Sequence, residues 1–127
     1  MNFKPILIIP GEKKSIFFEI FFKSINSKKF ISPLILICNE KIFNTEIKKF
    51  NFKRKVEKVN SEKIFEKDFI NKKIYLIDIT NYKSSNYVQK CFEFAFKLIK
   101  YGLSDKLING PINKSRTLKK KYLGVTE

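Results

Sequence analysis

Two kinds of apolar pattern alternate along this chain. Short, continuous apolar runs predict strands that are buried on both faces, whereas apolar residues that recur every three or four positions predict amphipathic helices. The expected strands are 4–9, 33–38 and 74–79, a weaker and more exposed strand at 52–59, and a final strand at 106–109. The expected helices run from Ile16 to Ile25, from Asn39 through an apolar stripe that ends at Phe50, and from Asn86 to about Tyr101. The polar, mixed segment 60–72 receives no assignment.

Capping residues and side-chain spacing support these helices. Each helix start has a candidate capping residue, which is Ser15 for the first helix, Asn39 for the second, and Ser84 or Ser85 for the third. Gly102 fits the end of the last helix, and Glu19 and Lys23 form an i,i+4 pair in the first. The residues expected to face inward are Phe17, Phe18, Phe21, Phe22 and Ile25, then Ile42, Phe43, Ile47 and Phe50, and finally Val88, Cys91, Phe92, Ala95, Phe96 and Ile99.

The alternation of strands and helices defines the expected fold class. It implies right-handed strand–helix–strand units, and hence an α/β fold in three layers, with a largely parallel sheet and flanking helices. At 127 residues, with 43% hydrophobic content and 14 phenylalanines, the chain has room for one modest domain and its core. No internal repeat or low-complexity linker divides the chain, so 1–127 is predicted to be a single α/β unit.

The chain is strongly basic. Lys and Arg number 27 against 12 Asp and Glu, which gives a formal net charge of +15 and raises the question of nucleic-acid binding. The basic residues are nevertheless scattered singly and in pairs along the whole chain, beside many Ile, Asn and Phe, a mixture that AT-rich coding produces. Only 53–55 and 119–121 form tight basic runs, and each is more simply a solvated turn or helix face. The composition therefore does not favour nucleic acid as a partner.

The cysteine and histidine content restricts the chemistry of this chain. Cys38 and Cys91 lie far apart, each in an apolar run, which predicts buried, reduced thiols and no zinc site. Histidine, the commonest acid–base group and a common transition-metal ligand, does not occur. The N-terminus leads directly into a strand, without a leader pattern, and no apolar run reaches the ~18 residues needed to span a bilayer. We therefore expect a cytoplasmic protein without membrane contact.

Three loops are candidates for ligand binding, because open parallel sheets bind ligands beyond the carboxyl ends of their strands. They are 10–15, 78–81 and 109–114. In the third loop, Gly110 permits close backbone approach and Pro111 fixes the turn. Asn113 is placed to cap a helix whose free N–H groups would face an anion, Lys114 adds a positive charge, and Thr126 offers a hydroxyl group one segment later. Taken alone, these residues are explained more readily by an ordinary strand-to-helix turn, because short Gly and Pro signals are weak.

Four elements, in this order along the whole chain, carry a resemblance to a known family. They are Pro10-Gly11-Glu12 with Glu19-Ile20, the helix expected at 86–101, the Gly-Pro-Ile-x-Lys element from Gly110 to Lys114, and Gly124-Val125-Thr126-Glu127. With them the chain resembles the 4-hydroxythreonine-4-phosphate dehydrogenases, enzymes of vitamin B6 (pyridoxal 5'-phosphate) biosynthesis. The last two elements and their spacing are the specific part. The resemblance implies the N-terminal part of a fold like that of isocitrate and isopropylmalate dehydrogenases.

The resemblance also implies an activity. The complete enzyme would oxidise the hydroxyl group of 4-phosphooxy-L-threonine, with NAD or NADP taking the hydride and decarboxylation following. A divalent metal would polarise that hydroxyl, and its histidine ligands and most cofactor-binding residues are expected beyond this chain. The family forms homodimers whose active site draws on both subunits. In this chain the resemblance assigns substrate binding to Gly110, Lys114 and Thr126, with no catalytic or metal-binding residue, so the 127 residues alone are expected to be inactive.

Two departures from the family pattern leave alternatives open. Val125 stands where the family has a substrate-contacting histidine, and the first loop, at 13–18, lacks the family's glycines. A catalytically degenerate relative is therefore one alternative to the N-terminal part of an active enzyme. A small basic α/β module that binds nucleic acid or another anion is the other.

Overall fold

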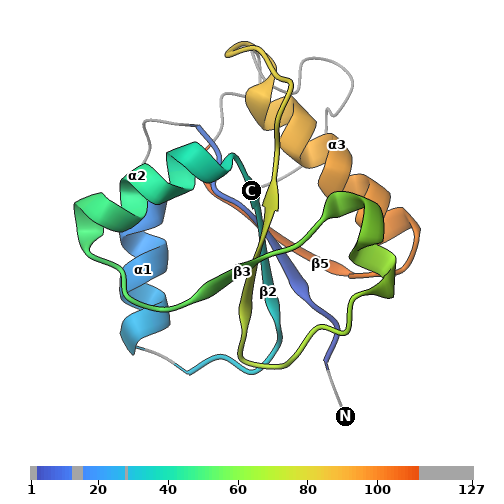
Figure 1. The fold of residues 1–127 in the computed structure, drawn as a ribbon, viewed down its shortest axis with the longest axis horizontal. Coiled ribbons are helices and arrows are strands. Elements are labelled where there is room, and N and C mark those ends of the chain that lie inside the picture. Colours follow the sequence, from blue (N-terminus) through green and yellow to red (C-terminus); the bar gives the residue numbers. More distant parts are fainter. Residues whose placement is uncertain (1–2, 13–15, 28, 112–127) are drawn as a thin grey trace.

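The computed structural model describes residues 3–12, 16–27 and 29–111. Within these residues, strands and helices alternate along the chain in the order β1 (Ile6–Ile9), α1 (Phe17–Ser27), β2 (Leu34–Cys38), α2 (Glu40–Phe50), β3 (Val56–Lys58), the 3-10 helix η1 (Ser61–Glu66), β4 (Ile74–Asp78), α3 (Tyr87–Lys100) and β5 (Lys106–Asn109). The strands form one sheet in the order β3-β4-β2-β1-β5, and every neighbouring pair is parallel (Figure 1). The predicted α/β class with a parallel sheet is confirmed.

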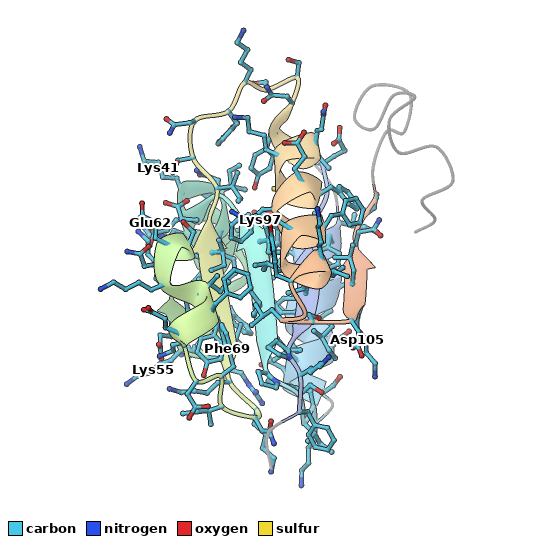
Figure 2. The ribbon with its side chains drawn as sticks, turned by 90° about the vertical axis from the view of Figure 1, so that its right-hand side faces the viewer. Lys41, Lys55, Glu62, Phe69, Lys97 and Asp105 are labelled. Carbon is cyan, nitrogen blue, oxygen red and sulfur yellow. The ribbon has the colours of Figure 1, made fainter. Side chains whose placement is uncertain are left out.

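Helices cover both faces of the sheet. Figure 1 shows α1 and α2 together on one side of the strands, and α3 on the other. Figure 2 looks onto the second side and shows η1, which carries Glu62, beside α3, which carries Lys97. The rings of Phe65 and Tyr101 meet edge to face there, with centroids 6.0 Å apart. The segment 60–72, which the sequence pattern left unassigned, thus supplies a short helix to this layer.

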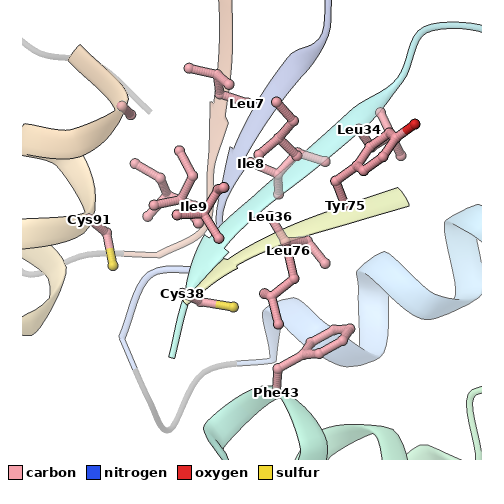
Figure 3. Close-up of a cluster of buried hydrophobic side chains, with 14 of the residues drawn as sticks. Leu7, Ile8, Ile9, Leu34, Leu36, Cys38, Phe43, Tyr75, Leu76 and Cys91 are labelled. Atoms are coloured by element: carbon pink, nitrogen blue, oxygen red, sulfur yellow. The ribbon is translucent and has the colours of Figure 1, made fainter. Parts of the chain in front are cut away.

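The core is built on the three central strands. All five residues of β2 are buried, and β1 and β4 are buried along most of their length. In Figure 3, Phe43 of α2 approaches the sheet from one side, whereas Ile9 and Cys91 lie on the α3 side. Burial on both faces explains why these strands read as unbroken apolar runs. The edge strands β3 and β5 are only partly buried.

Phenylalanine joins the two helices on one face. Phe22 of α1 stacks on Phe52, with ring centroids 4.3 Å apart and an interplanar angle of 19°. Phe18 of α1 lies 5.8 Å from Phe43 of α2, centroid to centroid. The inward residues predicted for α1 and α2 are all buried or packed against the core. Phe52 turns into this cluster, so the predicted strand 52–59 is shorter than expected and β3 comprises Val56–Lys58.

Two of the helix-end predictions are confirmed and one is wrong. The Asn39 side chain accepts hydrogen bonds from the N–H groups of Lys41 and Ile42, at 3.0 and 3.2 Å, and so caps α2. Gly102, with φ of +84°, follows the end of α3. Neither Ser84 nor Ser85 caps α3, because the helix begins after Asn86, whose side-chain oxygen instead accepts the N–H of Lys83 at 2.8 Å. The predicted cap Ser15 lies outside the described residues.

The inward face of α3 differs slightly from the expected one. Val88, Cys91, Phe92 and Ala95 are buried as predicted, whereas Phe96 and Ile99 are half-buried against the core. Leu98, which the spacing did not select, is fully buried. The 3.6-residue period places a stripe correctly, but it does not decide which of two neighbouring positions at its margin points inward.

Replacing the α2 cap tests this part of the fold. Asn39→Ala removes the acceptor for two helix N–H groups and the donor to Ile79, so we expect a loss of about 1 kcal/mol in the free energy of unfolding. Urea unfolding of the 127-residue chain measures it. Asn44→Ala, at an exposed position within the same helix, is the control and should cost nothing. Equal effects of the two substitutions would contradict the capping role.

Candidate functional site at the carboxyl edge of the sheet

Two of the three predicted ligand loops lie together at the carboxyl edge. β1 and β5 are parallel neighbours in register, with Ile9 opposite Asn109, so the segments that follow them leave the sheet side by side. The N–H of Gly110 donates to the carbonyl oxygen of Ile9 at 2.8 Å, and the N–H of Glu12 donates to that of Pro111 at 3.0 Å. The turns at 10–12 and 109–111 are therefore joined by backbone hydrogen bonds.

Both turns require glycine at their contact. A Cβ atom on the buried Gly110 would overlap the carbonyl oxygen of Pro10 and lie 2.8 Å from the ring of Phe17. Gly11 has a φ of +94°, and a Cβ atom there would overlap the carbonyl oxygen of Pro111. Because the Gly110 amide already donates to Ile9, Gly110 shapes this turn without offering its own N–H to a ligand. The role predicted for Gly110 in substrate binding stays a prediction.

The chain leaves β5 toward the other predicted site residues. Asn109 donates its side-chain N–H to the carbonyl oxygen of Gly110 at 3.0 Å, and Pro111 is exposed at the edge. Asn113, Lys114 and Thr126 lie outside the described residues. Their predicted roles therefore stay predictions, and the described part of the site is its base, the joined turns at 10–12 and 109–111.

The third predicted ligand loop, 78–81, begins at the end of β4 and lies beside the start of α2. β4 lies next to β2, and Asp78 accepts the N–H of Glu40 at 2.8 Å, while Asn39 donates its side-chain N–H to Ile79 at 3.0 Å. Asp78 and Asn39 together satisfy the N–H groups of the first three residues of α2. A helix start usually attracts anions through these groups. At α2 the protein's own side chains use them, so this helix start does not offer a phosphate site.

Lys58 offsets the negative charge of Glu40, which follows β2, and of Asp78, which ends β4. The ammonium group of Lys58 lies 3.0 Å from Glu40 and 3.9 Å from Asp78. The hydrogen bond and charge of Glu40 raise the pKa of Lys58. A shallow cavity of about 300 Å³ opens beside this loop, between the end of β4 and α3, and its charged lining residues are Asp78, Lys90, Glu93 and Lys97.

Only part of this cavity could be predicted from the sequence. Lys90 and Lys97 come from the outward face of α3, and Lys90 donates to the carbonyl oxygen of Asn81 at 2.8 Å. The sequence predicted loop 78–81 as a ligand loop but not its meeting with these lysines. Their spacing on one helix face was the available signal, since the helix that follows a strand packs back beside it. Lysines and acids alternate in the lining, so the cavity carries no strong preference for anions.

Neither cysteine can act as a nucleophile in this structure. Both thiols are buried and free, as predicted. Burial raises the pKa of Cys91 to about 12 and that of Cys38 well above its usual range. Burial likewise raises the pKa of Tyr87, whose hydroxyl oxygen accepts the N–H of Asn39 at 2.7 Å. The thiolate is the reactive and metal-binding form of cysteine, so these groups serve the core.

The described residues do not fit a metal ion. Nowhere among residues 3–12, 16–27 and 29–111 do three acidic, cysteine or histidine side chains come together. No catalytic step through a metal can therefore be assigned to this part of the chain. In the same residues, no helix is long and apolar enough to cross a membrane.

Substitutions at two glycines separate lack of space from backbone strain. Gly110→Ala places a methyl group against Pro10 and Phe17, and we expect overpacking to lower the free energy of unfolding by about 1–3 kcal/mol. Gly102 has a positive φ but nothing within 4 Å of a new Cβ, so Gly102→Ala should cost only the backbone term of about 1 kcal/mol. Urea unfolding compares the two. A Gly110→Ala variant as stable as the parent would show that the joined turns are not tightly packed.

Comparison with known proteins shows which solved structures share this fold. No protein-family model matches the chain, and no curated protein does. Among the solved structures that resemble it are a protein from Salmonella typhimurium provisionally described as a 4-hydroxythreonine-4-phosphate dehydrogenase, with 19% identity and a TM-score of 0.72, and a 4-hydroxythreonine-4-phosphate dehydrogenase from Burkholderia phymatum, with 17% identity and a TM-score of 0.71.

The matches cover nearly all of this chain but less than half of the solved ones. They include 90% and 100% of this chain, against 39% and 42% of the Salmonella and Burkholderia chains. At these identities the likeness concerns the fold. The chain thus has the fold of about two fifths of the length of these two solved chains, which confirms at the level of fold the resemblance given by its sequence elements.

Proposed function

We propose that this chain is the N-terminal part of an NAD(P)-dependent 4-hydroxythreonine-4-phosphate dehydrogenase and supplies part of its substrate site. The fold likeness over 90–100% of the chain supports this, together with the elements at 10–12 and 110–114. The main support is that backbone hydrogen bonds join these two turns at the carboxyl edge of the sheet. The Gly110–Lys114 element therefore begins at the edge where parallel sheets bind ligands.

Each residue of the proposed site has a distinct task. Gly110 lets the two turns approach and so sets the direction in which the chain continues. Lys114 is proposed to place its ammonium group against the phosphate of 4-phosphooxy-L-threonine, because a lysine acts as a compact point charge toward such groups. Thr126 is proposed to donate its hydroxyl hydrogen to the substrate. Together they would hold and orient the substrate from one side.

The remaining functions are assigned to residues outside those described. NAD or NADP supplies the hydride acceptor when bound, and a divalent metal the positive charge beside the reacting hydroxyl. The described residues gather no such metal site, and the proposal places its ligands and most of the cofactor site elsewhere in the complete enzyme. That enzyme is proposed to be a cytoplasmic homodimer.

Substrate binding by the chain itself tests the role of the carboxyl edge. In NMR titrations, 4-phosphooxy-L-threonine should shift the amide signals around Gly11 and Gly110, whereas L-threonine, which lacks the phosphate, should not. Lys114→Ala removes one charged contact and should weaken the affinity about tenfold. Lys106→Ala, at the start of β5 and so at the other end of the strand, is the control and should leave it unchanged. Shifts confined to other parts of the chain would contradict the site.

A second, independent prediction follows from the proposed location of the metal ligands and most of the cofactor site outside this chain. Without the metal ligands and most of the cofactor site, the 127-residue chain should not reduce NAD or NADP when given 4-phosphooxy-L-threonine and a divalent metal. The absorbance of the reduced nicotinamide measures this. Turnover by the 127 residues alone would show that the chemistry does not depend on residues outside this chain.

A further inference from the structure

A group of basic residues lies at the opposite edge of the sheet. A cavity of about 220 Å³ is lined by Lys29, Phe30, Arg54 and Lys72, and we call it the basic cavity. Lys29 and Phe30 precede β2, Arg54 precedes β3, and Lys72 precedes β4. Since these strands are parallel neighbours, the segments before them meet at the amino edge (Figure 1). The basic cavity is thus separated from the site at 10–12 and 109–111 by the length of the strands.

Backbone hydrogen bonds fix the wall of the basic cavity. The N–H of Lys72 donates to the carbonyl oxygen of Ile31 at 2.8 Å, and the N–H of Leu34 donates to that of Lys73 at 2.9 Å. Lys72 also has a φ of +68°, in the left-handed region that lysine rarely adopts. The surrounding hydrogen bonds hold this conformation, and Lys72 lines the cavity. Such strained residues cluster at functional sites.

The guanidinium group of Arg54 is positioned by an aromatic ring. It lies 5.3 Å from the ring centroid of Phe30, and Phe30 is itself half-buried against the core. Stacking uses the flat face of a guanidinium group and leaves the N–H donors around its rim free. Arg54 is therefore held in place without losing its capacity to bind a ligand with two parallel hydrogen bonds.

The basic cavity contains positive charge without a matching acid. No carboxylate lines it, and among the residues that the structure describes Lys29, Arg54 and Lys72 make no ion pair. Glu57, the acidic residue on β3, pairs instead with Lys67 and with Lys73, the latter at 3.3 Å. The hydrogen bonds from these two lysines also lower the pKa of Glu57. Three cations on three separate segments thus face one small volume without an internal counterion.

We propose that the basic cavity binds a small phosphate ligand, of the class of pyrophosphate and compact phosphate esters. A ligand with at least two negative charges matches three converging cations, and Arg54 supplies the two-pronged geometry that phosphate oxygens accept. The small volume favours a compact ligand over a nucleic-acid strand, which needs a basic track. This inference does not depend on the proposed dehydrogenase function, because the two sites use different residues at opposite edges.

Pyrophosphate is the probe that tests the basic cavity. Calorimetric titration of the 127-residue chain with pyrophosphate should give saturable binding that Arg54→Ala weakens about tenfold or more. Phe30→Leu keeps every charge but removes the ring, and should weaken binding roughly two- to fivefold. Arg54→Lys should recover only part of the affinity lost in Arg54→Ala. NMR titration should place the shifted amide signals at 29–31, 54 and 72, away from Gly110.

Lys41→Ala provides a charge-matched control. Lys41 lies on the first turn of α2, and Figure 2 shows it near the opposite end of the molecule from Lys55, the neighbour of Arg54. It should change pyrophosphate affinity by less than about twofold at physiological salt. Equal weakening by Lys41→Ala and Arg54→Ala would show attraction by net charge alone and overturn the proposal. So would the absence of saturable binding, or tighter binding of a single-stranded RNA of about 12 nucleotides than of pyrophosphate.

Discussion

The burial of β2 on both faces is the constraint on which the rest of the structure depends. Each fully buried leucine or isoleucine side chain contributes about 1.5–3 kcal/mol, and a strand of five buried residues gains this only if apolar helices cover both sides of the sheet. The crossovers through α1 and α2 on one face and α3 on the other meet this requirement. They also make the strands parallel, which gathers all strand ends at one edge and all strand starts at the other.

The two edges of the sheet differ in how far the protein's own side chains satisfy the groups exposed there. At the carboxyl edge, the loops after β2 and β4 are closed by Asn39 and Asp78, so the helix start there is occupied from within. The turns after β1 and β5 are joined by backbone hydrogen bonds, and the second turn is followed in sequence by Lys114. At the amino edge, Arg54 and Lys72 line a cavity whose lining, within the described part of the chain, contains no acidic residue. An anion site is thus proposed at each edge, on backbone turns and Lys114 at one and on a basic cavity at the other.

The local sequence pattern was sufficient to predict the elements that depend on interactions between residues close in sequence. Continuous apolar runs predicted β1, β2 and β4, and Asn39 was identified as a cap because its side chain acts on its own helix. The wrong caps of α3 depend on the turn before that helix, where Asn81 has a positive φ and Asn86 closes the turn. Nothing in the spacing of Ser84 and Ser85 specifies that turn.

The strand order could not be predicted from the same patterns. β4 inserts between β2 and β3, and the adjacency of these three strands brings residues 29–30, 54 and 72 together. Periodicity reports which face of a strand is buried, but not which strand is its neighbour. The sequence predicts loops 10–15 and 109–114 separately as ligand loops, whereas the contact between their first residues depends on the pairing of β5 with β1 across almost the whole chain. The interlocking of Gly11 and Gly110 is therefore a property of the assembled sheet.

The two buried thiols have a practical consequence. Cys38 ends β2 and Cys91 lies within α3, so they belong to different layers of the same core. A thiol-directed reagent in solution reaches either one only when that part of the core opens. The rate of labelling at each cysteine therefore measures how often the sheet or the helix layer opens. The natural sequence thus contains two chemical reporters of local unfolding, with no added label.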